Sequence, residues 1–328
     1  MKVLCVGEAM AEFARAGADG LWRRGFAGDV LNVAWGIAAL SGTVLGGTVL
    51  SDPAPDGAVG LLSRVGDDPF SHDLLRFLDG AGIGRAHVAA VPGATLGLYA
   101  IETDDEGERA FTYWRGQSAA RGLADEASAL REAFEAAELV FLSGITLAIV
   151  GREGRRNLFD ALGRPGQRPF LVAFDSNLRP RLWDDPGDIR PALEAAFAAS
   201  DLVLPTHDDE RAVWGDRDAR ATLERHGGRD VVVKDGAGPT LFSIGGEEGA
   251  VPVGDPVRPL DTTGAGDAFD AALIVAWLQG LAPRTAVARA QAVARLVVQH
   301  PGALAPVDAL RAAWNAARRS ESQPVPSP

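Results

Sequence analysis

The stretch DTTGAGDAFDAALIVAWLQG (261–280) joins turn-forming residues directly to a strongly apolar helix. Gly264 and Gly266 let the backbone bend tightly and approach a ligand without a Cβ in the way. A helix that begins here leaves unpaired N–H groups and the positive end of its dipole at this point, which favours an anion. Asp267 lies in the same first turn. The stretch therefore predicts an anion-binding turn beside a carboxylate.

This combination suits phosphoryl transfer. Backbone amides can stabilise the charge of the transferred group while the carboxylate takes the proton of the accepting hydroxyl. The alternative is an ordinary helix N-terminus, at which Asp267 only complements the dipole. The stretch is not a P-loop, because the chain has no G-x-x-x-x-G-K-[ST]. It is also not a dinucleotide fingerprint, because Phe269 stands where that motif has its third glycine.

Upstream of this stretch, short apolar runs alternate with helical patterns. Such alternation predicts an α/β fold, in which a mostly parallel central sheet is flanked by helices. The expected strands lie at 2–8, 59–66, 138–144, 169–175, 201–206 and 229–236. The expected helices lie at 29–41, 69–81, 125–136, 152–163, 188–199, 217–226, 283–299 and 306–317. Asp29 is the expected N-cap of the first of these helices.

Two stretches interrupt the alternation. Residues 94–115 predict a β-hairpin with its tip at DDEG, and residues 10–28 are expected to pair with it. Together they would form a small β-sheet lid that could cover a site. Residues 1–319 are expected to form one domain, and 320–328 a disordered tail. No function is indicated for the loop at 51–58.

The composition is that of an ordinary globular protein. The chain has 328 residues, of which 47% are hydrophobic and 23% charged. Its net charge of −12 argues against general nucleic-acid binding, since the phosphate backbone repels an acidic surface. The single cysteine, Cys5, allows neither an intramolecular disulfide nor a cysteine-based zinc site. We expect no signal peptide and no membrane span, and therefore a cytoplasmic protein.

The motif D-T-T-G-A-G-D-A-F resembles the signature of the ribokinase-like (PfkB) carbohydrate kinase family, which also lies near the C-terminus. GEAMAEF and AGDVLNVA, near the N-terminus, resemble the first signature region of that family. A closer similarity, to the 2-keto-3-deoxygluconate kinase subgroup, rests on further segments. These are RGFAGDVLN (24–32), GLYAIETDDEGERAFTYWR (97–115), FLSGITLAI (141–149), FDSNLRPRLW (174–183) and DDERAVWG (208–215).

The resemblance implies a ribokinase-like fold and an ATP-dependent, Mg²⁺-dependent phosphotransferase. Its substrate would be 2-keto-3-deoxygluconate and its product 2-keto-3-deoxy-6-phosphogluconate. Asp267 would be the catalytic base, and Gly264, Ala265 and Gly266 would form the anion hole. This agrees with what the residues themselves predict.

The implied substrate is a sugar acid, so the site needs a cation for its carboxylate. Arginine suits this role because its planar fork can bind a carboxylate through two hydrogen bonds. Arg115 is the first candidate and Arg179 the second, although Arg179 could instead meet phosphate. The resemblance implies contacts with the rest of the sugar from Gly28, Asp29, Asn32, Tyr99 and Tyr113. The alternatives are helix capping for the polar residues and ordinary aromatic packing for the tyrosines.

The expected nucleotide site follows the strand at 229–236. The chain has only two lysines, and the resemblance gives Lys234 a role at the nucleotide. It implies further nucleotide contacts from Asn177, Glu210, Gly236 and Gly238. Glu210 stands at the glutamate of the family's Asn-x-x-Glu pattern, which helps to organise Mg²⁺ and phosphate, but His207 replaces the asparagine. The other histidines show no ligand spacing and are expected to be surface or capping residues.

Other functions remain open at this point. The acceptor could be fructose, ribose or keto-deoxygalactonate instead. The fold could also serve a non-catalytic sensor of sugar acids or nucleotides, and a dinucleotide-dependent oxidoreductase would fit the alternation but lacks the glycine fingerprint. The expected partners are a sugar acid and ATP, with no nucleic acid and no membrane. An apolar face of the lid suggests a homo-oligomer, such as a dimer.

Overall fold

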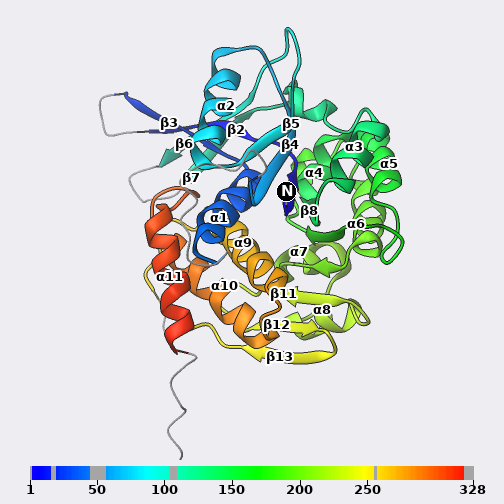
Figure 1. The fold of residues 1–328 in the computed structure, drawn as a ribbon, viewed down its shortest axis with the longest axis vertical. Coiled ribbons are helices and arrows are strands. Elements are labelled where there is room, and N and C mark those ends of the chain that lie inside the picture. The colour runs from blue at the N-terminus through cyan, green and yellow to red at the C-terminus, as the bar shows by residue number, and fades with distance from the viewer. Residues whose placement is uncertain (1, 16–19, 45–56, 104–108, 255–256, 321–328) are drawn as a thin grey trace, which may run out of the picture.

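The apolar run near the N-terminus forms a central strand, β1 (Val3–Val6), of a large sheet (Figure 1). Its side chains alternate between two hydrophobic cores: Val3 and Cys5 pack into one, and Leu4 and Val6 into the core on the opposite face. A strand buried on both faces has no polar side, which explains its unbroken apolar sequence. The structure is a computed structural model that describes residues 2–15, 20–44, 57–103, 109–254 and 257–320.

The large sheet has nine strands in the order β13-β12-β11-β10-β9-β8-β1-β4-β5. All neighbours from β11 to β5 are parallel, and β12 and β13 extend one edge in antiparallel fashion. The remaining bounds are β4 (Val59–Val65), β5 (Gly84–Ala90), β8 (Leu139–Ser143), β9 (Leu171–Asp175), β10 (Leu202–Val203), β11 (Asp230–Val233), β12 (Thr240–Ile244) and β13 (Glu247–Val251). The mostly parallel sheet that the sequence predicts is confirmed.

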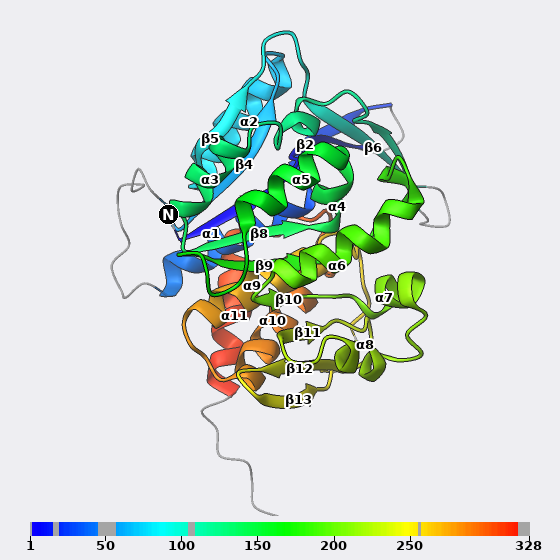
Figure 2. The same ribbon diagram turned by 90° about the vertical axis from the view of Figure 1, so that its right-hand side faces the viewer.

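Helices cover both faces of this sheet, as Figures 1 and 2 show. One face carries α1 (Asp29–Val44), α2 (Pro69–Ala81), α9 (Ala265–Leu278), α10 (Pro283–Val297) and α11 (Val307–Ser320). The other carries α3 (Ala127–Glu135), α4 (Gly144–Ile149), α5 (Gly151–Leu162), α6 (Ile189–Ala199), α7 (His207–Trp214) and α8 (Ala219–Arg225). In the described part of the chain, no helix has both the length and the apolarity needed to cross a membrane.

A second, four-stranded sheet projects from the molecule, at the upper left in Figure 1. It consists of β3 (Trp22–Ala27), β2 (Met10–Arg15), β6 (Gly97–Thr103) and β7 (Arg109–Trp114), in that order. The two predicted segments therefore do pair, through parallel neighbours β2 and β6. The predicted DDEG tip, most of the 51–58 loop and the tail beyond Ser320 lie outside the described residues.

The predicted N-cap of α1 is wrong by one residue. The carbonyl of Gly28 accepts the N–H of Asn32 at 2.7 Å, so Gly28 precedes the helix and Asp29 is its first residue. Gly28 has φ 150°, and a Cβ there would lie 2.4 Å from the Glu8 carbonyl oxygen. Only glycine fits this close approach of the two chain segments.

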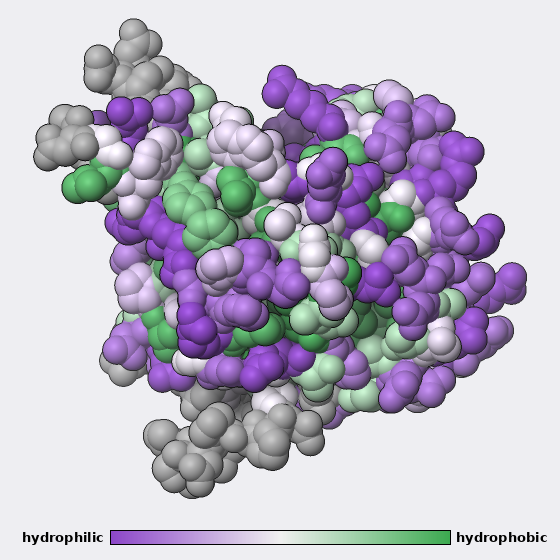
Figure 3. All heavy atoms as spheres, turned by 90° about the horizontal axis from the view of Figure 1, so that it is seen from above, coloured by the Kyte–Doolittle hydropathy of each residue, from purple (hydrophilic) through white to green (hydrophobic). Residues whose placement is uncertain are grey.

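Viewed from above, the molecule shows hydrophilic residues around smaller hydrophobic areas (Figure 3).

Candidate active site

Polar side chains follow adjacent strands of the large sheet at their carboxyl ends. Glu8 comes after β1, Ser143 and Asp175 end β8 and β9, and Thr206 and Lys234 follow β10 and β11. These strands are neighbours in the sheet, so the residues meet at one edge. In open α/β sheets, ligands bind outside this edge.

The first turn of α9 lies at this site. Gly264 is its N-cap, with φ 75°, and a Cβ there would lie 2.6 Å from the Cβ of Ala303. Among the described residues, the amides of Gly264, Gly266 and Asp267 have no hydrogen-bond acceptor, whereas the Ala265 amide donates to the Thr262 carbonyl at 3.3 Å. An anion could therefore accept hydrogen bonds from these free amides. Ala265, predicted in the anion hole, already has a partner for its amide.

The Asp267 carboxylate accepts a hydrogen bond from Nδ2 of Asn32 on α1, at 2.7 Å. Burial raises the pKa of Asp267 to about 7, and repulsion from Asp29 adds to this shift, whereas the Asn32 hydrogen bond opposes it. A carboxyl group with a pKa near neutral suits a general base. The structure thus brings Asp267, Asn32 and Asp29 together, as predicted.

Asp29 is held by the end of β8 and by the segment that follows β9. It accepts hydrogen bonds from Oγ of Ser143 and, at 3.2 Å, from Nδ2 of Asn177. Burial raises the pKa of Asp29. Asn177 has the unusual φ of 25°, which turns the chain after β9 toward this site. Asn177, predicted at the nucleotide, therefore contacts a residue of the predicted sugar site.

The second sheet presents its aromatic row to the same region. The strand register places Glu12, Tyr99 and Tyr113 side by side on β2, β6 and β7. Tyr99 is 5% exposed and its hydroxyl donates to Glu12, whereas Tyr113 is half-exposed. The Tyr99 and Tyr113 rings have centroids 5.5 Å apart. Burial, together with Glu12, raises the pKa of Tyr99, and the charge of Asp267 also acts on it, so this sheet lies close to α9.

Arg115 directly follows β7 and its side chain is only 9% exposed. It forms an ion pair with Glu8, which also accepts a hydrogen bond from Oγ of Ser118 at 2.5 Å. Nε of Arg115 is buried without a hydrogen-bond partner. The charge of Arg115 also acts on Asp29, which places this cation beside the predicted sugar site.

Arg179, the second predicted cation, is exposed. Its Nη1 donates to the Leu178 carbonyl at 2.8 Å, and the Leu178 amide donates to Asp209 at 2.9 Å. Burial raises the pKa of Asp209 to about 6, and the charge of Arg179 is among the effects that oppose this. Arg179 thus lies at the rim near strands β9 and β10, whereas Arg115 is buried.

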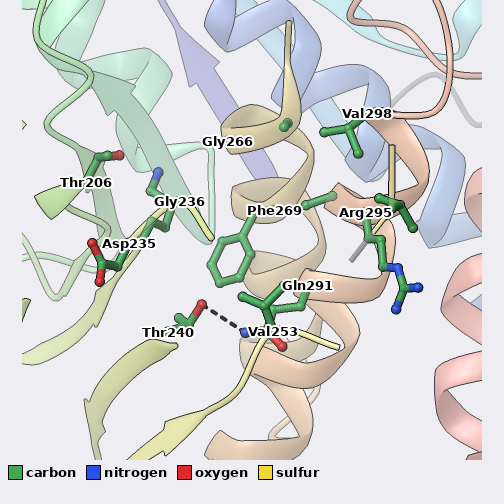
Figure 4. A pocket seen from close by; sticks show the side chains of 14 residues that line it. Thr206, Asp235, Gly236, Thr240, Val253, Gly266, Phe269, Gln291, Arg295 and Val298 are labelled. Atoms are coloured by element: carbon green, nitrogen blue, oxygen red, sulfur yellow. Dashed lines mark hydrogen bonds between the residues drawn. The ribbon is translucent and has the colours of Figure 1, made fainter. Parts of the chain in front are cut away.

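A pocket of ≈ 370 Å³ adjoins the α9 turn (Figure 4). This volume falls in the range of small-molecule sites. Apolar side chains form most of its wall, and Gln291 crosses it to donate to Oγ1 of Thr240 at 3.0 Å. The lining residues are Thr206, Lys234, Asp235, Gly236, Thr240, Val253, Val257, Ala265, Gly266, Phe269, Gln291, Ala294, Arg295 and Val298. Of the residues predicted at the nucleotide, Lys234 and Gly236 line this pocket, whereas Gly238 does not.

Sequence reasoning missed two acids at Lys234. Its Nζ lies 2.9 and 3.0 Å from the two carboxylate oxygens of Asp270 and 3.1 Å from Oδ2 of Asp175. Asp270 follows Asp267 by three residues in an otherwise apolar helix. The sequence does contain a signal for this contact: a charged residue inside an apolar helix, which needs a partner because a buried charge is costly when unpaired.

The structure does not bring Glu210 to the pocket. Glu210 is fully buried, where it pairs with Arg225 and lies 3.2 Å from Nε2 of His226. Arg225 continues this network to Asp216 at 2.9 Å. The network binds α7 to α8 and the segment after it. His226 is buried, at 1% exposed, and is the C-cap residue of α8, which agrees with the capping role that the sequence left open for it.

No group of three or more potential metal-binding side chains occurs among the described residues. Mg²⁺ at phosphoryl-transfer sites keeps several waters and is held largely by phosphates, with one or two carboxylates. The side chains here do not define a magnesium site by themselves. The free amides of the α9 turn and the apolar pocket beside it do fit a nucleotide, whose phosphates and base need these two environments.

Known proteins resemble the chain over almost its full length. The pfkB family carbohydrate kinase pattern matches residues 1–310. A 2-dehydro-3-deoxygluconokinase of Escherichia coli (strain K12) is 34% identical over 320 residues, covering 95% of this chain and 99% of that protein. The one from Dickeya dadantii (strain 3937) is 33% identical over 320 residues, with 94% and 98% covered. A fructokinase of Klebsiella pneumoniae is 28% identical over 277 residues, with 83% of each covered.

A solved structure agrees with the fold. The crystal structure of a PfkB protein from Polaromonas sp. JS666 matches with a TM-score of 0.78 at 27% identity, covering 95% of this chain and 99% of that one. The match therefore includes both sheets and the helices that carry the site.

Proposed function

Because the chain belongs to the pfkB family of carbohydrate kinases, we propose that it phosphorylates 2-dehydro-3-deoxygluconate, also called 2-keto-3-deoxygluconate, with ATP. The product is 2-keto-3-deoxy-6-phosphogluconate. One observation carries the choice of a sugar acid: Arg115 is a buried cation beside Asp29, and its Nε has no hydrogen-bond partner. A substrate carboxylate supplies the acceptor that this donor lacks. Relatives at 33–34% identity that are named 2-dehydro-3-deoxygluconokinase support the same substrate.

The reacting groups meet at the first turn of α9. Bound ATP supplies the γ-phosphoryl group. The Asp267 carboxylate takes the proton of the accepting sugar hydroxyl, which makes the oxygen a better nucleophile. The free amides of Gly264 and Gly266 stabilise the negative charge on the transferring group. Asn32 holds the Asp267 carboxylate in place through its 2.7 Å hydrogen bond.

The remaining residues orient the sugar acid. Asp29, Asn32 and Gly28, at the start of α1, face its hydroxyls, and Asn177 fixes Asp29. Arg115 binds its carboxylate, with Arg179 at the rim as the second cation. Tyr113 offers a hydroxyl from the second sheet, whereas the hydroxyl of Tyr99 is engaged by Glu12. This sheet acts as a lid that excludes water, which suppresses hydrolysis of ATP.

The nucleotide lies in the pocket beside α9, with Val253, Val257 and Phe269 against its base. Gly236 and Gly238 form the turn after β11 that passes the nucleotide, and Mg²⁺ accompanies the phosphates. Glu210 has no direct part in this arrangement, because Arg225 and His226 occupy it.

We further propose a dimeric state and a cytoplasmic location. The chain forms a dimer through the lid sheet, whose edge strand β7 exposes Trp114 on the face opposite Tyr113. It works in the cytoplasm, consistent with a lone, buried and unpaired Cys5.

The test is an ADP-release assay with ATP and Mg²⁺ on a small panel of acceptors: 2-keto-3-deoxygluconate, its galacto epimer, gluconate, fructose and ribose. Marked preference for a keto-deoxy acid supports the proposal. Turnover with fructose or ribose alone would retain the kinase and remove the role of Arg115. A protein that binds ATP in calorimetry but turns over none of the panel would favour the sensor.

The pH dependence of the reaction should show the titration of Asp267. Since only its ionised form accepts a proton and its pKa is raised to about 7, kcat/KM should fall by about tenfold per pH unit below that value. Rate measurements from pH 5.5 to 8.5 at saturating ATP check this. A flat profile down to pH 5.5 would contradict it.

A further inference from the structure

The ammonium of Lys234 lies between two carboxylates, those of Asp270 and Asp175. An ammonium group has three N–H donors. The carboxylate oxygens that face them belong to Asp270, at 2.9 and 3.0 Å, and to Asp175, at 3.1 Å. The side chains of Asp270 and Asp175 are 0% and 6% exposed. Although Lys234 lines the pocket, its ammonium is paired with these two buried carboxylates.

The cluster of Lys234, Asp175 and Asp270 joins the parts that carry the site. Asp175 ends β9, Lys234 follows β11, and Asp270 lies one turn along α9 from Asp267. Two buried carboxylates need a buried cation, because an unpaired charge inside a protein is costly. Among the described residues, Lys234 is the cation that forms ion pairs with them.

The same cation acts on Asp267. The polar groups that act on Asp267, or on which Asp267 acts, are Asp29 and Asn32 from α1, Asp175 from β9, Lys234 after β11 and Tyr99 from β6. Burial and repulsion from Asp29 and Asp175 raise the pKa of Asp267, whereas Lys234 lowers it. The position of Lys234 therefore determines how much negative charge Asp267 meets.

We propose, on the premise that Asp267 is the base of the proposed function, that Lys234 is a positioning residue: its ammonium pairs with the buried Asp175 and with Asp270, one helical turn from Asp267, and contacts no phosphate of the nucleotide. Lys234 and Asp175 are then parts of the base's electrostatic environment.

The experiment compares Lys234→Met, Asp175→Asn and the double variant with the unaltered chain. For each, kcat/KM for the sugar acid is measured against pH, and ATP affinity by calorimetry. Lys234→Met should move the acid limb of the profile upward by about one pH unit, because an opposing charge is lost. Asp175→Asn should move it downward, because the like charge of Asp175 is removed. The double variant should lie between them, and ATP affinity should change less than about threefold in all.

Two results would overturn the proposal. One is a Lys234→Met protein with an unmoved acid limb and a fall of about tenfold or more in ATP affinity, which would indicate a phosphate ligand. The other is an Asp175→Asn profile that does not move downward. Should Lys234→Met fail to fold, with two carboxylates left unpaired, Asp175→Asn still decides, because it keeps the ion pair between Lys234 and Asp270.

Arg168→Met provides a matched control. It breaks another buried ion pair, with Asp201, which lies at the amino ends of β9 and β10, away from the candidate site. It should leave the pH profile and ATP affinity as they are. Failure of the proposed function itself is recognised separately, since Asp267→Asn would then retain turnover.

Discussion

Asp267→Asn is expected to lower kcat by roughly 10³-fold, within the range for loss of a general base. The asparagine keeps the shape of the side chain, but it has no carboxylate to accept the proton of the sugar hydroxyl. Dissociation constants for ATP and the sugar acid should change little. Steady-state rates and calorimetry on the same preparations measure the two effects.

Asp308→Asn is the matched control for this prediction. Asp308 is also an acid in the first turn of a helix, α11. There the substitution should cost only the dipole interaction, about 0.3–1 kcal/mol of stability, and leave kcat unchanged. If Asp267→Asn behaves in the same way, Asp267 only complements the dipole of α9 and is not the base.

Arg115→Met should raise KM for the keto-deoxy acid by roughly 10²-fold, since a charge-assisted hydrogen bond to a buried group contributes about 1.5–3 kcal/mol. KM for a neutral acceptor such as fructose should change far less, because fructose has no carboxylate. The ratio of the two effects is the measurement. Equal increases for both acceptors would remove the carboxylate role.

The control for Arg115 concerns its partner. Arg115→Met leaves Glu8 buried without its cation, which can harm folding whatever the substrate. The double variant Glu8→Gln, Arg115→Met removes both charges. It should recover stability but not the affinity for the acid. Recovery of both would show that Glu8, rather than the lost contact, caused the change in KM.

The parts of this protein that depend on local chemistry could be predicted from the sequence. The α9 turn is one such part, because Gly264 and Asp267 define a helix start within a few residues. The alternation of apolar runs likewise predicts the parallel strands, since each is buried on both faces. Strand β5, in contrast, is a half-exposed edge strand without an apolar run, and the short antiparallel β12 and β13 follow a glycine-containing turn. The sequence pattern does not separate them from loops.

The parts of the site that depend on contacts between distant residues could not be predicted in the same way. Lys234 meets Asp175 and Asp270, which are 59 and 36 positions away in the printed sequence. Glu210 is paired with Arg225 and His226. No spacing rule in the sequence shows that Arg225 points toward Glu210. A resemblance to a family carries roles to positions, but the partners of a charged side chain follow from the packing of this particular chain.

The crowding of Asp29, Asp175, Asp267 and Asp270 at one edge of the sheet also bears on how firmly the chain is folded. An aspartate in the unfolded chain ionises near pH 3.8, whereas folding raises the pKa of Asp267 to about 7. Between these values the folded state holds a proton that the unfolded state releases, so the free energy of unfolding declines as pH rises. Above pH 7, the full free-energy cost of ionising the buried Asp267 lowers the stability of the protein without bound ligands. The two hydrophobic cores must offset it, and the site is thus kept ready for its substrates at the expense of the stability of the unliganded fold.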